Sequence, residues 1–162
     1  MNYTKWITRT GLLLALTLVI QMMGFPSVVT GPLVNMMLFT AVHLVGWLGA
    51  SLIGGVTPWL ALVRGILPPP LAPLIPFIIA GNIILVSAYY FMLGRNNYLG
   101  IGLAALLKFA ILSSGVRFLV KLPPKVAQMM QMPQLLTALT GGFLALVLVK
   151  LLDRIFTKQN TG

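Results

Sequence analysis

Side chains that could carry out acid–base or nucleophilic chemistry are scarce in this chain. It has one histidine, His43, one acidic residue, Asp153, and no cysteine. General acid–base catalysis uses a positioned histidine or carboxylate, often as a pair, and these two residues belong to different predicted helices. No glycine-rich loop is followed by Lys-Ser or Lys-Thr, so the chain has no motif for nucleotide hydrolysis. We therefore expect no catalytic residues, and a protein that is not an enzyme.

A metal site is also not expected. Zinc, cobalt and nickel sites combine several nitrogen or sulfur ligands, and the chain offers a single imidazole and no thiolate. We expect His43 to make a hydrogen bond in the core. The sequence predicts no metal and no cofactor.

The composition excludes a water-soluble domain. The 162 residues are 59% hydrophobic and 7% charged, with a mean hydropathy of +1.00, whereas soluble domains have roughly 25% charged residues. The net charge of +10 comes from lysines and arginines scattered singly among apolar runs. Because they form no patch with interleaved aromatic residues, we expect no nucleic-acid binding. The lipid bilayer is the expected environment.

Glycine and proline divide the chain into six apolar segments, each close to the length of a membrane-spanning helix. The predicted spans are residues 6–23, 32–48, 51–67, 73–93, 98–120 and 133–156. Pro32 is placed in the first turn of the second span, and a short turn at residues 49–51 separates the second and third. The first span is expected to be retained, because MGFPSVV after it lacks a small-x-small cleavage site. The predicted fold class is an all-α integral membrane protein, a bundle of six transmembrane helices forming one domain over residues 1–162.

The basic residues predict the orientation of this bundle. Six of them fall on the side of the termini and of residues 94–97: Lys5, Arg9, Arg95, Lys150, Arg154 and Lys158. Cytoplasmic loops carry an excess of lysine and arginine. Both termini are therefore predicted to be cytoplasmic in a multi-pass protein.

Polar residues concentrate in the outer half of the predicted spans. We expect a ligand pocket there, lined by Asn35, Arg64, Asn82, Arg117, Lys121 and Gln134. Such an excess of cations favours a small anionic molecule. The alternatives are that the cations extend to lipid phosphates and that the asparagines join helices.

Lys108 is predicted near the middle of the membrane. It would extend to the interface, be neutral, bind backbone carbonyls, or pair with an external anion. These four alternatives remain open at the level of the sequence.

The stretch RGILPPPLAPLIPF, residues 64–77, combines an arginine with five prolines. Proline ends helices, and consecutive prolines favour a stiff polyproline geometry. We expect a helix end, a rigid crossing and a new helix, with Arg64 facing Asn82 across this loop.

Three stretches resemble the S components of energy-coupling factor (ECF) transporters, the substrate-binding membrane subunits of vitamin importers: TRTGLLLALTLVIQ, VTGPLVNMMLF and PLIPFIIAGNIILVSAYYFMLGR. The resemblance implies six helices, cytoplasmic termini, and a substrate site near the outer face. It also implies vitamin uptake across a prokaryotic plasma membrane, together with a transmembrane coupling subunit and two cytoplasmic ATPase subunits.

The resemblance also implies a docking surface on the first helix. The family's AxxxA motif, which contacts the coupling subunit, corresponds to Gly11 and Ala15, with glycine in the first position. Small residues at this spacing also serve ordinary packing between membrane helices.

The alternative function is a membrane anchor subunit of a larger complex, for example one that binds quinone or lipid. His43, Lys108 and Trp59, predicted near mid-depth, suit that interpretation. A purely structural assembly subunit is a third possibility.

Overall fold

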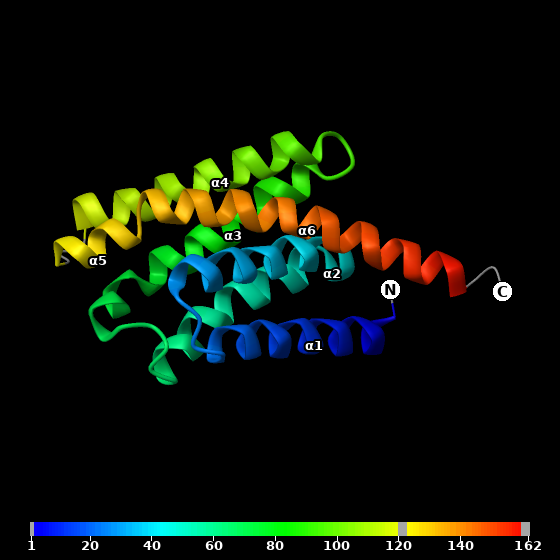
Figure 1. The fold of residues 1–162 in the computed structure, drawn as a ribbon, viewed down its shortest axis with the longest axis horizontal. Helices are drawn as coiled ribbons and strands as arrows, with labels where there is room; N and C mark the ends of the chain where they lie inside the picture. Colours follow the sequence, from blue (N-terminus) through cyan, green and yellow to red (C-terminus); the bar gives the residue numbers. More distant parts are fainter. Residues whose placement is uncertain (1, 120–122, 160–162) are drawn as a thin grey trace.

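The computed structural model describes residues 2–119 and 123–159, and these residues form helices and short connections without strands (Figure 1). The six α-helices among them are α1 (Tyr3–Met22), α2 (Ser27–Val63), α3 (Ile75–Met92), α4 (Asn97–Ser114), α5 (Pro124–Met129) and α6 (Met132–Gln159). A 3₁₀ turn, η1 (Pro69–Leu74), precedes α3, and a π-helical turn, η2 (Gly115–Leu119), follows α4. The predicted all-α class is confirmed.

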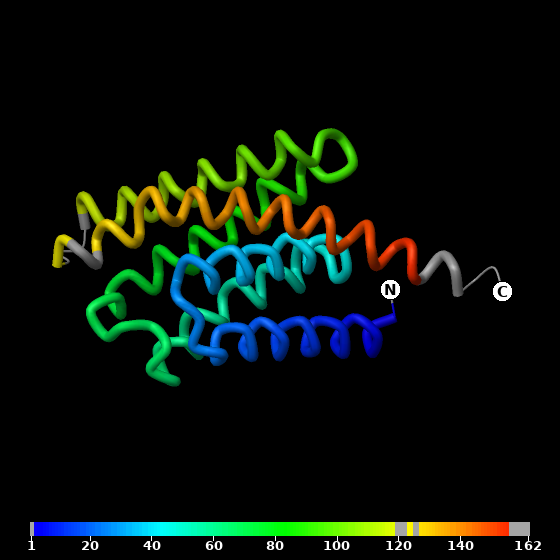
Figure 2. Tube along the Cα trace, in the orientation of Figure 1, coloured from blue at the N-terminus to red at the C-terminus, as the bar shows by residue number. Residues whose placement is uncertain are grey.

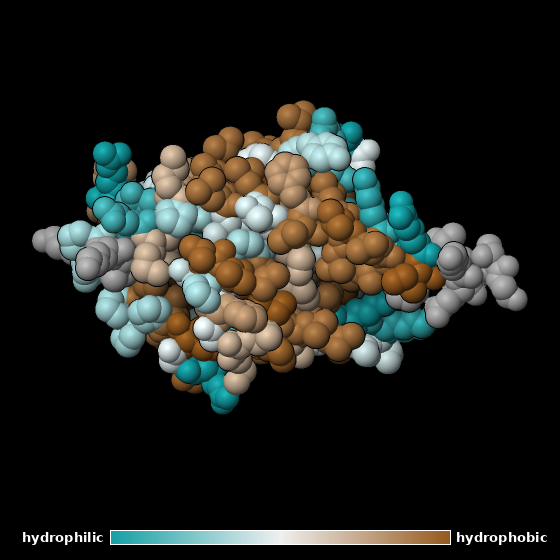
Figure 3. Space-filling model, in the orientation of Figure 1, coloured by the Kyte–Doolittle hydropathy of each residue, from teal (hydrophilic) through white to brown (hydrophobic). Residues whose placement is uncertain are grey.

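Four segments of the described chain are long and apolar enough to cross a membrane. They are Ser27–Val63, Pro69–Met92, Asn97–Phe118 and Ala127–Ile155. Many large apolar side chains are exposed on them, and Figure 3 shows a largely apolar band between two ends where hydrophilic residues gather. An apolar belt of this kind suits contact with lipid rather than water.

The second and third predicted spans form a single 37-residue helix, α2, which is interrupted at one residue. Gly46 has φ 75° and ψ −174°, and the chain folds back at this point (Figure 2). Glycine adopts positive φ without steric cost because it has no Cβ. The turn predicted at residues 49–51 is therefore wrong, since these residues are helical and Gly49 packs against Thr10 and Val45.

Other predicted boundaries shift for reasons of backbone geometry. The helix begins at Ser27, so Pro32 lies buried in its interior rather than in its first turn. It ends at Val63 rather than at residue 67, because Gly65 takes φ 70° just after the Arg64 cap, a common helix ending. The prolines after it form η1, a 3₁₀ turn, and not the expected polyproline crossing. Residue 120, the predicted end of the fifth span, lies outside the described residues.

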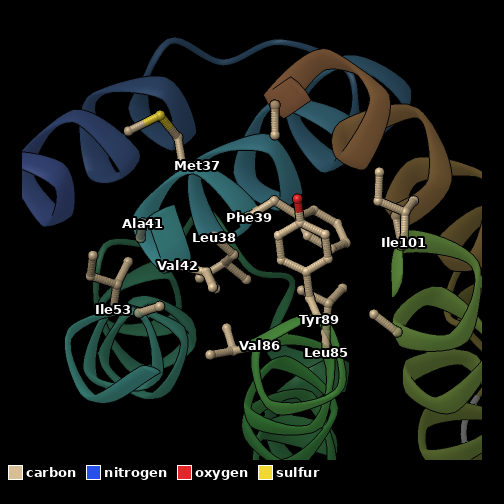
Figure 4. Close-up of a cluster of buried hydrophobic side chains, with 14 of the residues drawn as sticks. Met37, Leu38, Phe39, Ala41, Val42, Ile53, Leu85, Val86, Tyr89 and Ile101 are labelled. Atoms are coloured by element: carbon tan, nitrogen blue, oxygen red, sulfur yellow. The ribbon is translucent and has the colours of Figure 1, made fainter. Parts of the chain in front are cut away.

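The main core lies where the two halves of α2 meet α3 and α4 (Figure 4). Phe39, Tyr89, Leu38, Ile53 and Leu85 are all fully buried there. The rings of Phe39 and Tyr89 meet edge to face, with centroids 4.8 Å apart and planes at 87°. This geometry matches the attraction between the positive edge of one ring and the negative face of another.

The bundle has two distinct ends (Figure 1). One holds the start of α1, the end of α6, the Gly46 turn and the α3–α4 loop. The exposed basic residues Lys5, Arg9, Arg95, Lys150 and Arg154 belong to this end. The other holds the α1–α2 connection, η1 and α5.

Gly141 allows α6 to approach α2 closely, and this generates a prediction. A Cβ at Gly141 would lie 2.6 Å from the Pro32 carbonyl oxygen and 2.8 Å from the Met36 nitrogen, both backbone atoms. Gly141→Ala should therefore lower the free energy of unfolding by about 1–3 kcal/mol, as overpacking does. The measurement is reversible unfolding of the purified chain in mild detergent.

Gly102→Ala is the matched control, because a Cβ there meets nothing within 4 Å. Alanine in place of a helical glycine should stabilise by up to about 1 kcal/mol. Equal stabilisation by both substitutions would show that α6 and α2 do not pack as closely as described.

A candidate ligand-binding site

A cavity of about 530 Å³ opens at the end that holds the α1–α2 connection and η1. This volume is typical of a small-molecule site. Its wall is largely apolar, with contributions from Val34, Leu71, Ile78, Met129 and Met130. The polar residues that line it are Gln21, Ser27, Thr30, Asn35, Thr57, Asn82, Lys108 and Gln134.

The inner wall of this cavity contains a buried lysine held by two asparagines. Lys108, in the middle of α4, is only 4% exposed. Its Nζ donates hydrogen bonds to Oδ1 of Asn35 at 2.7 Å and to Oδ1 of Asn82 at 2.8 Å. Asn35 comes from α2 and Asn82 from α3, and both are buried. We call these three residues the Lys108 cluster.

The direction of each hydrogen bond in the cluster is set by its outer partners. Asn82 donates through Nδ2 to the Gly54 carbonyl at 2.9 Å, and a carbonyl can only accept. On the other side, the Thr137 hydroxyl donates to the Gln134 carbonyl at 3.1 Å, so its oxygen accepts from Asn35 Nδ2 at 3.4 Å. Both amide oxygens therefore point at Nζ. The negative ends of two amide dipoles converge on the amine.

Glycines make room for the cluster on three sides. A Cβ at Gly54 would lie 3.0 Å from Cβ of Asn82, and one at Gly81 would lie 3.3 Å from Cγ of Lys108. Likewise, a Cβ at Gly141 would lie 2.7 Å from Cβ of Asn35. The lysine and both asparagines can approach one another because these neighbouring residues have no side chains.

The charge of Lys108 is balanced only by neutral groups within the described residues. Its two hydrogen-bond partners are amides. The chain's one acidic residue, Asp153, lies 16 residues beyond Thr137 on α6, about 24 Å along the helix axis. Among the described residues, the cavity therefore has one lysine and no carboxylate beside its apolar wall.

The structure brings together some of the predicted site residues and not others. Asn35, Asn82 and Gln134 line the cavity. Arg64 and Arg117 are exposed and are not among the residues that line it. Arg64 does not face Asn82, whose partners are Lys108 and the Gly54 carbonyl, because the early end of α2 places Arg64 in the connection after the helix. Lys121 lies outside the described residues.

The contacts of Lys108 with Asn35 and Asn82 were not predicted from the sequence. The positions of Asn82 and Lys108 in the sequence do indicate that these two residues lie near each other. Asn82 lies ten residues before the end of α3, and Lys108 lies eleven residues after the start of α4. Helices joined by a short loop run side by side, so these two residues had to lie at similar depth. Asn35 was predicted one turn inside its span, but α2 begins at Ser27 and places it eight residues in. The side-chain amides around Lys108 were not among the four alternatives considered.

The opposite half of the bundle contains hydrogen bonds of a different kind. His43 Nε2 and Tyr89 Oη lie 2.8 Å apart, which is the core hydrogen bond expected for this histidine. Trp6 Nε1 donates to the Val45 carbonyl at 2.9 Å, and Trp47 Nε1 donates to Ser87 Oγ at 2.8 Å. These contacts join α1 to α2 and α2 to α3 near the Gly46 turn.

The docking residues predicted on the first helix lie on an open surface. Gly11 and Ala15 are exposed on α1, and a Cβ at Gly11 would meet nothing within 4 Å. The buried face of α1 contains Thr10, Leu13 and Thr17 instead.

The apolar helices and the internal polar cluster define the class of this protein, a multi-pass α-helical membrane protein. In comparisons with known proteins, no family model, no curated protein and no solved structure matches the chain.

The Lys108 cluster predicts strong coupling between its members. Asn82→Ala should lower the free energy of unfolding by about 1–2 kcal/mol, because it removes a hydrogen bond to a buried ammonium. In a Lys108→Met background the same change should cost less, since the bond to Lys108 is already absent and only the bond to the Gly54 carbonyl is lost. A double-mutant cycle of unfolding in detergent measures the difference.

Asn97→Ala serves as a control for the loss of an amide. Asn97 makes only a 3.4 Å hydrogen bond from an exposed backbone nitrogen, so its replacement should change stability by less than about 0.5 kcal/mol. Additive effects of Asn82→Ala and Lys108→Met would contradict the hydrogen bonds assigned to the cluster.

Proposed function

We propose that this chain is the substrate-binding subunit of an ECF-type importer, and that it captures a small anionic, vitamin-like molecule. The observation that carries the proposal is the cavity of about 530 Å³ with a buried lysine in its wall, at the end opposite the termini. A binding subunit needs such a pocket on the side from which substrate arrives.

The stretches that resemble S components contribute directly to this pocket. VTGPLVNMMLF provides Asn35, and PLIPFIIAGNIILVSAYYFMLGR provides Asn82. These are the two asparagines that bind Lys108. Both stretches thus contain residues that line the cavity.

The proposed topology has six spans with both termini in the cytoplasm of a prokaryotic cell. The interruption at Gly46 supports counting the two halves of α2 as separate spans, and these join α1, α3, α4 and α6. The basic residues at the end with the termini support a cytoplasmic location for that end. The cavity then faces outward.

Transport by this chain requires energy from partner subunits. The sequence lacks a phosphate-binding loop, and its one acidic residue lies on α6 near the terminal end. We propose that a transmembrane coupling subunit and two cytoplasmic ATPase subunits supply this energy. The exposed face of α1 around Gly11 and Ala15 is the proposed contact, because small residues allow another helix to approach closely.

Purification from native membranes in mild detergent tests this assignment. The tagged chain should co-purify with one coupling subunit and two ATPases, identified by mass spectrometry. Gly11→Leu should lower the recovered ATPases by about tenfold, a loss of about 1.4 kcal/mol in binding, without unfolding the chain, since its Cβ has open space.

Gly102→Leu is the control, because Gly102 lies on α4 with equally open surroundings. It should leave the recovery of ATPases unchanged. Co-purification with redox subunits instead of ATPases would overturn the proposal in favour of a membrane anchor.

A further inference from the structure

In its ammonium form, Lys108 has one hydrogen-bond donor more than the described residues use. An ammonium has three N–H donors, and two of them go to Asn35 and Asn82. Lys108 also lines the cavity. The third donor can therefore serve a molecule that enters the cavity.

If Lys108 is charged, its two amide partners offset only part of the free-energy cost of burying it. A charged lysine within a membrane helix costs at least about 2.5–3.5 kcal/mol, and amide dipoles offset only part of such a cost. A hydrogen bond between two asparagines would join α2 and α3 without any charge. When protonated, Lys108 therefore adds a positive charge at the cavity wall, which a purely structural link between α2 and α3 does not need.

The number of charges around the cavity restricts the ligand class. Among the described residues that line it, Lys108 is the one basic residue, and none is acidic. A carboxylate with a single negative charge would neutralise it. A phosphate monoester would leave a buried negative charge without a partner, and an amine would bring two positive charges together, and both arrangements are costly.

The rest of the wall indicates the body of the ligand. The apolar residues Val34, Leu71 and Ile78 come from α2, η1 and α3, and Met130 follows the end of α5. Thr57 and Gln134 add neutral polar groups. A largely apolar molecule fits this wall, with its acid group directed at the Lys108 cluster.

We propose that Lys108 is the anion-binding residue of this cavity and that the natural ligand is a monocarboxylic acid with a largely apolar body. This inference rests on the proposed substrate-binding function. It assigns the recognition of charge to Lys108 in the inner wall, rather than to the exposed Arg64 and Arg117.

Matched probes test the charge preference of the isolated chain in zwitterionic nanodiscs. The probes are 3-phenylpropionate, indole-3-propionate and octanoate, each compared with its primary amide, its phosphonate and its amine. Calorimetry or ligand-detected NMR measures binding. At least one carboxylate should bind about tenfold more tightly than its amide, about 1.4 kcal/mol, and more tightly than its phosphonate and its amine.

Asn35→Asp is the decisive variant, because it places a carboxylate beside Lys108 with almost no change in shape. The new carboxylate forms the ion pair that the ligand would otherwise form. The preference for carboxylate over amide should therefore disappear while amide binding remains. This variant keeps an acceptor for Lys108 Nζ, so it avoids the loss of folding that Lys108→Met could cause.

Arg64→Gln is the matched control for general attraction of anions to a chain with a net charge of +10. It removes an exposed positive charge that is not among the residues lining the cavity and should leave the carboxylate preference unchanged. Loss of the preference in Arg64→Gln would overturn the assignment to Lys108. Three other results would also overturn the assignment. The carboxylate preference could persist in Asn35→Asp, acid and amide could bind equally to the unaltered chain, or every carboxylate could fail to bind at millimolar concentration.

These results are separate from the test of the importer assignment. Co-purification with ATPases does not depend on the charge of the ligand. A chain that recovers the ATPases but binds acid and amide equally overturns only the role of Lys108. A chain that prefers carboxylates but recovers no ATPases supports the role of Lys108 and overturns the importer assignment.

Discussion

The buried amine of Lys108 is the constraint on which the arrangement of this bundle depends. A charge in this position must be surrounded by acceptors, and the two that it uses come from different helices. The outer hydrogen bonds of the asparagines extend the connection to Gly54 in the second half of α2 and to Thr137 in α6. One amine thus sets the depth and rotation of α2, α3, α4 and α6 relative to one another. Sliding any of these helices by one turn would leave a buried polar group without a partner, which is costly in an apolar environment.

Small residues allow this polar network to coexist with close packing. Gly54, Gly81 and Gly141 stand next to the members of the cluster, and each leaves too little room for a side chain without displacement of its neighbours. Membrane helices gain little from the hydrophobic effect against one another, so close contact and hydrogen bonds provide much of their association. The same glycines therefore serve the fold and the site. Gly46 has a separate role, because its positive φ reverses the chain and brings Leu38 against Gly54.

The two ends of the bundle differ in how they use their polar groups. Near the Gly46 turn, the His43–Tyr89 pair and the Trp6 and Trp47 hydrogen bonds join neighbouring helices around the apolar core. At the opposite end lies the cavity, and the connections there contain prolines and short turns instead of continuous helix. A bundle that is closed at one end and open at the other suits the capture of a molecule from one side of a membrane. Three of the polar residues predicted in the outer half of the spans, Asn35, Asn82 and Gln134, line this cavity.

The sequence by itself determined that this is an all-helical membrane protein, because so few charged residues cannot cover a water-soluble surface and because glycine and proline separate apolar runs of membrane length. It also indicated Asn35, Asn82 and Gln134, since polar residues inside apolar helices are conspicuous. Only the tertiary structure decided that Lys108 lies between the two asparagines and that Arg64 and Arg117 do not reach the cavity. The reason is physical: the depth of a side chain depends on where its helix begins and ends, and Gly65 and Ser27 shift those points by several residues. Which side chains then meet depends on helix rotation, and a set of helices this apolar has almost no amphipathic pattern from which that rotation could be inferred.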